Sequence, residues 1–197
     1  MHNTCKHARD KRYQECLPIR GKIKNAVRAK DIEAILLSEE VLNILTLLGY
    51  DPDAEDPLKK LRVGKVILLS DPDPDGHHIN CLELGLLWRV MPGLFEQGIV
   101  YVARAPEYYA KVGKESVFGR TKEKLRAKLK AMGAPKTTEL HHIKGYGEMD
   151  AGDLRTVAFD PSTRSLIRVR PTSEENSLLF GKLMAEDTEL RRKLMGI

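Results

Sequence analysis

The pattern of apolar and polar residues along the chain predicts alternating helices and strands. Apolar residues recur with helical spacing over residues 29–49, where Ser38 is placed to cap a second helical segment and Gly49 to end it. The run KVILLS, residues 65–70, is short and apolar, which is typical of a buried parallel strand. A mostly buried helix is expected over residues 79–90.

A second strand, residues 99–105, follows that helix and completes the order strand, helix, strand. In a parallel sheet this arrangement puts the loop after the first strand at the carboxyl edge, where open α/β sheets bind ligands. We therefore predict an α/β fold with a parallel sheet flanked by helices. The ligand site is expected in the loop that begins at Asp71.

The chain on either side of this unit has a different pattern. Residues 1–28 are basic and poorly periodic, and we expect an extended arm with a turn at Arg20 and Gly21. The elements expected downstream are a charged amphipathic helix over 122–132 capped by Thr121 and closed at Gly133, a glycine-broken loop over 141–150, a short helix over 153–159, a strand over 165–170 and a helical end over 173–195.

The charge of the chain is unevenly distributed. Of its 33 basic and 28 acidic residues, residues 1–30 hold nine Lys or Arg against two acids, and residues 110–144 hold ten against three. Between them lie the acidic loop 51–57 and a cluster of aspartates. This arrangement suits a polyanion bound beside a cation site. Ordinary solvated charge on helix faces is an alternative that stays open at this point.

The cysteines and the apolar runs indicate the compartment. Cys5, Cys16 and Cys81 are widely spaced and form no Cys-x-x-Cys pair, so we expect reduced thiols rather than a disulfide framework or a zinc site. No apolar run approaches the roughly 20 residues that a membrane span needs. The first 16 residues lack the apolar core of a secretory signal. A cytoplasmic protein is expected.

The stretch VILLSDPDPDGHHI, residues 66–79, places Asp71, Asp73 and Asp75 within five residues at the end of the predicted strand. Carboxylates this close repel one another, so we expect a positive charge between them. Magnesium usually takes one or two protein carboxylates and keeps waters or phosphate oxygens as its other ligands. Alternate residues of an extended segment point to the same side, which makes Asp71 and Asp73 the predicted direct ligands and Asp75 a third.

This stretch also has other interpretations. A calcium loop of EF-hand type is rejected, because the twelfth position from Asp71 is Leu82 rather than glutamate and a strand precedes the loop. An acidic surface turn stays open. His78 is either a group that supports the metal or a phosphate, or a helix-start residue packed on the sheet.

Several segments, in order along the chain, resemble one family. SDPDPDGHHI (70–79) resembles the D-x-D-x-D-G-x-H-I motif of the TOPRIM domain of type II DNA topoisomerases. LPIRGKIKN (17–25) resembles their L-P-x-[RK]-G-K-I-x-N segment, and HIKGYGEMD (142–150) their Y-K-G-L-G-E-M loop. FDPSTRSLIRV (159–169) and LMAEDTELRRKLM (183–195) are similar to the carboxyl-terminal end of gyrase B and topoisomerase IV B-type subunits. The resemblance covers essentially the whole chain.

The resemblance implies a TOPRIM Rossmann-like parallel sheet with an α+β C-terminal tail. The implied organisation is a basic arm over 1–28, a TOPRIM core over 29–113 and the tail over 114–197. The family's TOPRIM domain opens with an E-G-D-S segment, whose glutamate completes the metal site and acts as general acid and base, and no such segment occurs in these residues. The chain is expected to be either a separately encoded subunit, as in the split topoisomerases of T-even-like phages, or a truncated reading frame, and Met1 with the family-like C-terminus makes the first plausible. Both stay open.

The implied function is that of a Mg²⁺-binding subunit of an ATP-dependent type II DNA topoisomerase, inactive alone and working in the cytoplasm or in an infected cell. Mn²⁺ is expected to substitute for Mg²⁺. The implied partners are double-stranded DNA, a GHKL ATPase and transducer chain that binds ATP, and an A-type subunit whose tyrosine cleaves DNA. DNA contacts are expected at Arg20, Lys22, Asn25 and Lys144. The alternatives are a non-catalytic fragment that binds DNA or a partner, and a stand-alone TOPRIM nuclease.

The tyrosines of this chain are expected to be structural, because the family places the cleaving tyrosine on another subunit. Trp88 and Phe95 are expected in a core or an interface. The tyrosines concerned are Tyr13, Tyr101, Tyr108, Tyr109 and Tyr146.

Overall fold

The computed structural model describes residues 1–19, 21–170, 174–185 and 188–196. Its residues pack into two compact units, and the chain passes between them several times. Unit 1 is Met1–Pro18, Leu69–His78 and Ala103–Ile167, and unit 2 is Ile19–Leu68, Ile79–Val102 and Arg168–Ile197. These units record which residues pack together and not which segments fold alone, so the domain boundaries at residues 28 and 113 stay predictions.

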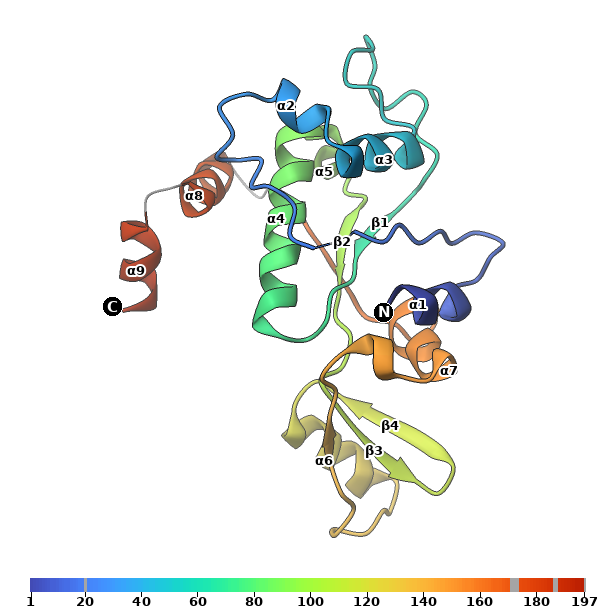
Figure 1. Ribbon diagram of the computed structural model, residues 1–197. Coiled ribbons are helices and arrows are strands. Elements are labelled where there is room, and N and C mark those ends of the chain that lie inside the picture. Colours follow the sequence, from blue (N-terminus) through green and yellow to red (C-terminus); the bar gives the residue numbers. More distant parts are fainter. Residues whose placement is uncertain (20, 171–173, 186–187, 197) are drawn as a thin grey trace. The chain divides into compact units, whose positions relative to one another are not determined.

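The predicted strand–helix–strand order is confirmed. Strand β1 (Val66–Leu68) pairs in parallel with β2 (Val100–Ala103), with Val66 opposite Val100. Helix α4 (Pro74–Val90) connects the two strands (Figure 1). Strand β6 (Leu166–Arg168) lies on the other side of β2, which gives the sheet order β1-β2-β6. The fold is α/β.

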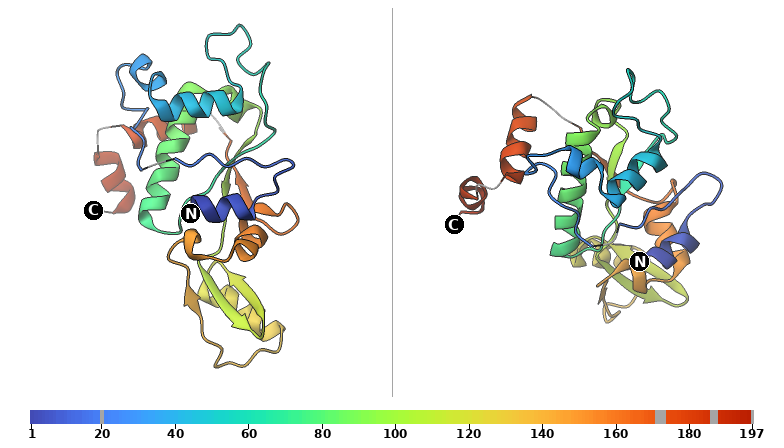
Figure 2. Two further views of the ribbon diagram at one scale, coloured as in Figure 1. Left: turned by 45° about the vertical axis from the view of Figure 1, so that its right-hand side comes forward. Right: turned by 45° about the horizontal axis from the view of Figure 1, so that its top comes forward.

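Helix α4 organises the core of unit 2 through its apolar side chains. Trp88 meets the ring of Phe180 edge-on at 5.6 Å, and Phe180 belongs to α8 (Glu174–Met184). Both views of Figure 2 show α8 beside α4, followed by α9 (Glu189–Met195). The predicted start of this helical end, residue 173, lies outside the described residues. The buried side chains of α4 and of α5 (Gly93–Glu96) in this core are Leu86, Leu87, Val90, Leu94 and Phe95.

The helical prediction for residues 29–49 is confirmed as two helices, α2 (Glu33–Leu36) and α3 (Glu39–Leu48). Ser38 Oγ accepts a hydrogen bond from the Val41 amide, so Ser38 is the cap of α3. Gly49 ends α3 in the left-handed conformation at φ 71°. Local capping chemistry sets both ends, which is why the sequence predicts them.

Unit 1 contains a helix where the sequence predicted an extended arm. Helix α1 (His2–Ala8) buries Cys5 and Ala8 against Ile143, Tyr146 and Leu154. The prediction of an extended arm is therefore wrong for these residues, because tertiary burial of one face stabilises a helix that has weak local signals. The elements around it are β5 (His141–His142), the 3₁₀ helix η1 (Tyr146–Glu148), α7 (Ala151–Leu154) and the π-helical turn η2 (Arg155–Phe159).

Residues 106–142 of unit 1 form a small hairpin–helix module. Strands β3 (Tyr108–Val112) and β4 (Glu115–Gly119) pair antiparallel around the turn at Gly113, and β5 pairs with the other edge of β3. Helix α6 (Lys122–Ala131) packs on one face of this hairpin (Figure 1). Thr121 caps α6, and Gly133 follows it at φ 73°, as predicted. The module has its own core of Ala110, Val117, Leu125 and Leu129.

Two further findings concern the cysteines and membrane contact. Cys5, Cys16 and Cys81 are all free thiols. Within the described ranges, no helix is both long enough and apolar enough to cross a bilayer.

Candidate functional site

Asp71 lies three residues after β1, in the part of the loop that belongs to unit 1. Its Oδ1 accepts a hydrogen bond of 2.8 Å from the backbone amide of Tyr146. The Cα of Gly145 faces the same carboxylate, since a Cβ placed on it would lie 3.6 Å from Asp71 Oδ1. The acidic loop and the glycine loop 144–149 therefore meet at Asp71.

Gly76 allows the first turn of α4 to approach Asp71. A Cβ on Gly76 would collide with the carbonyl oxygen of Asp71, which is a backbone atom and not the far end of a flexible side chain. Gly76 does not have a positive φ. The absence of a side chain, rather than an unusual backbone conformation, is what this position requires.

Asp73 is the N-cap of α4. Its Oδ1 accepts a 2.6 Å hydrogen bond from the Gly76 amide, and Pro74 occupies the first helical position, where its missing N–H is not needed. Helix α4 thus begins at Pro74 rather than at residue 79, so the extended geometry assumed for the three aspartates is wrong from Pro74 onward. Asp75 lies in the first helical turn and is exposed.

The helix terminus also supplies part of the positive charge that the aspartate cluster requires. The N-terminus of a helix favours carboxylates, and both Asp73 and Asp75 lie there. His78 is exposed on the second turn of α4. That His78 supports a metal, or that it supports a phosphate, stays a prediction. The alternative, in which His78 packs on the sheet, does not fit an exposed side chain.

Tyr146 is fixed beside Asp71 as a structural residue. The residue is 2% exposed, and its hydroxyl donates a 3.3 Å hydrogen bond to the carbonyl oxygen of Pro106. Burial raises the pKa of the Tyr146 phenol above its usual range, and the Asp71 carboxylate adds to the rise. A phenol that holds its proton so strongly is a poor nucleophile, which agrees with the structural role expected for it.

Helix α1 packs against the same glycine loop. Thr4 Oγ1 donates to the carbonyl oxygen of Gly147 at 3.0 Å, and a side chain on Gly147 would collide with Met1. Burial raises the pKa of the Cys5 thiol to about 11, with smaller contributions that include Cys16 and Asp71. This is the thiol of a packed core residue rather than of a reactive one.

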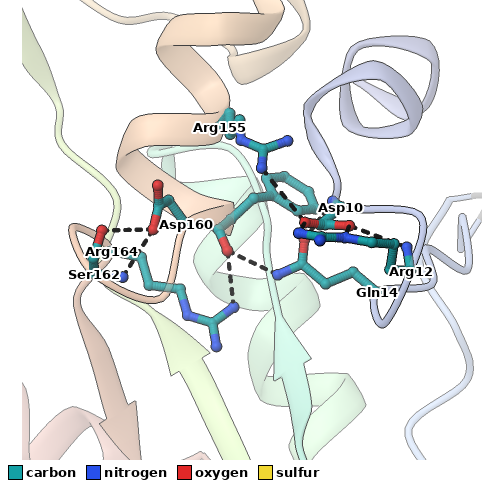
Figure 3. A network of polar contacts seen from close by, with 8 residues as sticks. Asp10, Arg12, Gln14, Arg155, Asp160, Ser162 and Arg164 are labelled. Atoms are coloured by element: carbon teal, nitrogen blue, oxygen red, sulfur yellow. Dashed lines mark hydrogen bonds and ion pairs between the residues drawn. The ribbon is translucent and has the colours of Figure 1, made fainter.

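A polar network fixes the chain that follows α1 (Figure 3). Asp10 is 8% exposed and accepts hydrogen bonds from the backbone and guanidinium of Arg12, and Arg155 of η2 lies 3.6 Å away. These hydrogen bonds hold the pKa of Asp10 far below its usual value. Gln14 Nε2 donates to the carbonyl oxygen of Phe159 at 2.8 Å. The network joins the N-terminal segment to η2 within unit 1.

The number of ligating side chains that lie together bears on the predicted metal site. Among the residues outside the masked positions, no group of three or more His, Cys, Asp and Glu side chains is placed to hold a metal ion. Asp71 and Asp73 each use one oxygen in the hydrogen bonds above, which leaves the second oxygen of each for a ligand. Ser70 Oγ, next to Asp71, is buried and has no hydrogen-bond partner in the described part of the chain. Such an atom accommodates a further polar ligand at this point.

The predicted DNA contacts are divided between the units. Lys144 is exposed and is the first residue of the glycine loop that meets Asp71. Lys22 is exposed in unit 2. Asn25, also in unit 2, donates through Nδ2 to the carbonyl oxygen of Met184 at 2.9 Å and accepts from the Val27 amide at 3.0 Å, so its amide already has a structural role. Arg20 lies outside the described residues.

Comparisons with known proteins place these features in context. Residues 135–196 match the family model described as the DNA gyrase B subunit, carboxyl terminus. The chain is 37% identical over 193 residues to the DNA gyrase B subunit of Thermotoga maritima and 35% identical over 193 residues to that of Archaeoglobus fulgidus, each match covering 98% of this chain. It is 36% identical over 192 residues, 93% of its length, to the DNA topoisomerase 4 B subunit of Salmonella typhimurium. The chain spans 30% of the length of each of these relatives.

Over nearly its whole length, the chain is similar to part of the topoisomerase B-type subunits. More particularly, it is similar to the B subunits of DNA gyrase and of topoisomerase IV, and its last third matches the family model of the gyrase B carboxyl terminus.

Proposed function

We propose that the chain is the Mg²⁺-binding, TOPRIM-type part of a type II DNA topoisomerase B subunit and that it supports DNA cleavage and religation. The observation that carries this proposal is the hydrogen bond between Asp71 and the amide of Tyr146. It joins two of the segments that resemble the family, and Lys144, a cation suited to a phosphate, lies in the second of them. Carboxylates for a metal and a cation for a phosphate within one unit suit phosphodiester chemistry.

In this proposal Asp71 and Asp73 hold Mg²⁺, or Mn²⁺ in its place, through the oxygens that the Tyr146 and Gly76 amides leave available. When bound, the ion would neutralise the negative charge on the scissile phosphate and the 3′-oxygen. The two amides orient the carboxylates, and Lys144 binds a neighbouring phosphate. This chain supplies no nucleophile.

The remaining chemistry belongs to partners. An A-type subunit provides the cleaving tyrosine, and an upstream B-type segment with the E-G-D-S motif provides the general acid and base. A GHKL ATPase and transducer segment binds ATP. Duplex DNA is the substrate, and Lys22 is its proposed contact from unit 2.

The test uses the reconstituted enzyme, with the A-type subunit and the upstream B-type segments supplied. Asp71→Asn and Asp73→Asn are each compared with Asp53→Asn, which removes one exposed carboxylate from the acidic loop 51–57. The first two variants are expected to lose metal-dependent cleavage of supercoiled DNA and the spectroscopic signal of bound Mn²⁺, whereas Asp53→Asn retains both. Unchanged Mn²⁺ binding in Asp71→Asn would reject the metal site.

A non-catalytic role in binding DNA or a partner is the second candidate. It is favoured by the structural roles of Asp73 as a helix cap and of Asn25 as a loop anchor. In that case the Asp71→Asn variant cleaves DNA as the unmodified enzyme does.

A further inference from the structure

We propose that the hairpin–helix module, residues 106–142, carries a second surface for the backbone of duplex DNA, separate from Asp71. The module holds nine Lys or Arg residues against four Asp or Glu residues. This excess equals the formal net charge of +5 of the whole chain. The module is therefore one of two strongly basic segments of the chain, residues 1–30 being the other, and it has its own small core.

The charges on α6 form two rows on its exposed side. Residues four apart on a helix lie one above the other, about 6 Å along its axis. The opposite side of α6 is buried through Leu125 and Leu129. The first row is Lys122, Arg126 and Lys130, the second is Lys124 and Lys128, and the small residues Ala127 and Ala131 lie between them.

In the described residues, the cations of these rows are not held in ion pairs with carboxylates. Within the described ranges, no ion pair joins an acidic side chain to any of the nine cations of the module. Arg126 Nη1 donates to the carbonyl oxygens of Lys136 and Thr138, and Lys128 Nζ donates to that of Phe118. A carbonyl oxygen has no net charge, so these hydrogen bonds orient the side chains of Arg126 and Lys128 without neutralising their positive charge.

Such an arrangement has an energetic cost that a polyanion removes. Like charges four residues apart destabilise a helix, and α6 carries three such pairs. Its one acid, Glu123, lies in the first turn, where a hydrogen bond from the Thr121 side chain lowers the pKa of that carboxyl. A ligand with closely spaced negative charges relieves this repulsion along the whole helix.

Duplex DNA fits both rows better than a membrane does. It carries one negative charge per roughly 1.7 Å of axis, enough to engage two rows of cations at once. A helix that lies on a membrane presents large apolar residues such as Trp, Phe and Leu to the lipid. The outer face of α6 instead presents alanines, which allow a phosphate backbone to come close.

The test measures binding of the full chain to a 30-base-pair duplex over a series of salt concentrations. The module variant is Lys114→Gln/Lys124→Gln/Lys130→Gln, at three exposed positions. The matched control is Lys59→Gln/Lys60→Gln/Lys65→Gln, which removes the same charge from exposed positions of unit 2. Circular dichroism confirms that both remain folded.

The measured quantity is the slope of the logarithm of the binding constant against the logarithm of the salt concentration. This slope is expected to become shallower by about 0.9 for each phosphate that is no longer bound, so by about 2–3 in the module variant. In the control it is expected to change by less than about 1. Absence of DNA binding by the unmodified chain, equal changes in both variants, or a loss of binding to anionic vesicles with DNA binding unchanged would each overturn the proposal. Failure of the Asp71 metal site leaves this salt dependence unaffected, so the two proposals are tested separately.

Discussion

Asp71 and Tyr146 are joined by a 2.8 Å hydrogen bond in which the backbone amide of Tyr146 donates to Asp71 Oδ1. Tyr146 is 2% exposed, so solvent does not replace a lost acceptor at this position. The acidic loop and the glycine loop are consequently one structural unit, and a change at Asp71 acts on both.

Asp71→Ala is expected to lower the free energy of unfolding by about 1–3 kcal/mol, because it leaves the buried Tyr146 amide without an acceptor. Asp71→Asn keeps an acceptor oxygen and is expected to cost less than about 1 kcal/mol. Urea unfolding followed by circular dichroism measures both. An equal loss in the two variants would show that the charge, rather than the acceptor, holds the glycine loop.

Asp73 combines a capping role with the proposed metal role, and two substitutions separate them. Asp73→Ser keeps an N-cap acceptor for the Gly76 amide, whereas Asp73→Ala loses it and is expected to be less stable by about 1 kcal/mol. Both remove the carboxylate, so both are expected to lose Mn²⁺ binding in the reconstituted enzyme. If Asp73→Ser keeps Mn²⁺ binding and only the less stable Asp73→Ala loses it, the role of Asp73 as a ligand is contradicted.

The parts of the fold that the sequence predicts are those set by local chemistry. Ser38 and Thr121 are recognised as caps because the signal lies within four residues of its effect. Strands β1 and β2 are recognised because both are short apolar runs. The β3–β4 hairpin was not predicted, although the two-residue turn Gly113-Lys114 between alternating residues is a hairpin signal.

The sequence predicts which residues belong to the candidate site, but it does not predict how they are arranged. The Asp-Pro pair at residues 73 and 74 is a helix-start signal that the aspartate pattern masked. The contact of Asp71 with Tyr146 and the burial of α1 depend on residues far apart in the chain. Helical or strand periodicity carries no information on such pairs, so only the structure shows them.

Gly76→Ala tests the close approach of α4 to Asp71. A methyl group there meets the Asp71 carbonyl, and the backbone has to shift, so we expect a loss of roughly 1–3 kcal/mol in the free energy of unfolding. Gly64→Ala is the matched control, because a Cβ on Gly64 meets no atom within 4 Å and its φ is not positive. Its effect is expected to be within about 0.5 kcal/mol. Two variants of equal stability would remove the structural reason given for glycine at residue 76.

Glu83, in the middle of α4, makes the stability of unit 2 depend on pH. Burial raises the pKa of Glu83 from 4.5 to about 7. Between these two values the unfolded chain has released the proton and the folded chain has kept it, so the free energy of unfolding falls as pH rises from about 4.5 to 7 and then levels off. Each pKa unit corresponds to about 1.4 kcal/mol, which sets an upper limit of about 3 kcal/mol on the loss.

Glu83→Gln removes this titration while keeping the size of the side chain. The variant and the unmodified protein are expected to have similar stability at pH 5, and the variant is expected to be more stable at pH 8, by up to about 3 kcal/mol. Urea unfolding at both pH values measures the difference in the free energy of unfolding between the two proteins. Titratable groups that both proteins share contribute equally and cancel in this difference. Glu55→Gln, at an exposed position, is the control and is expected to show no such growth with pH. A difference that does not increase between pH 5 and pH 8 would show that Glu83 is already ionised in the folded protein.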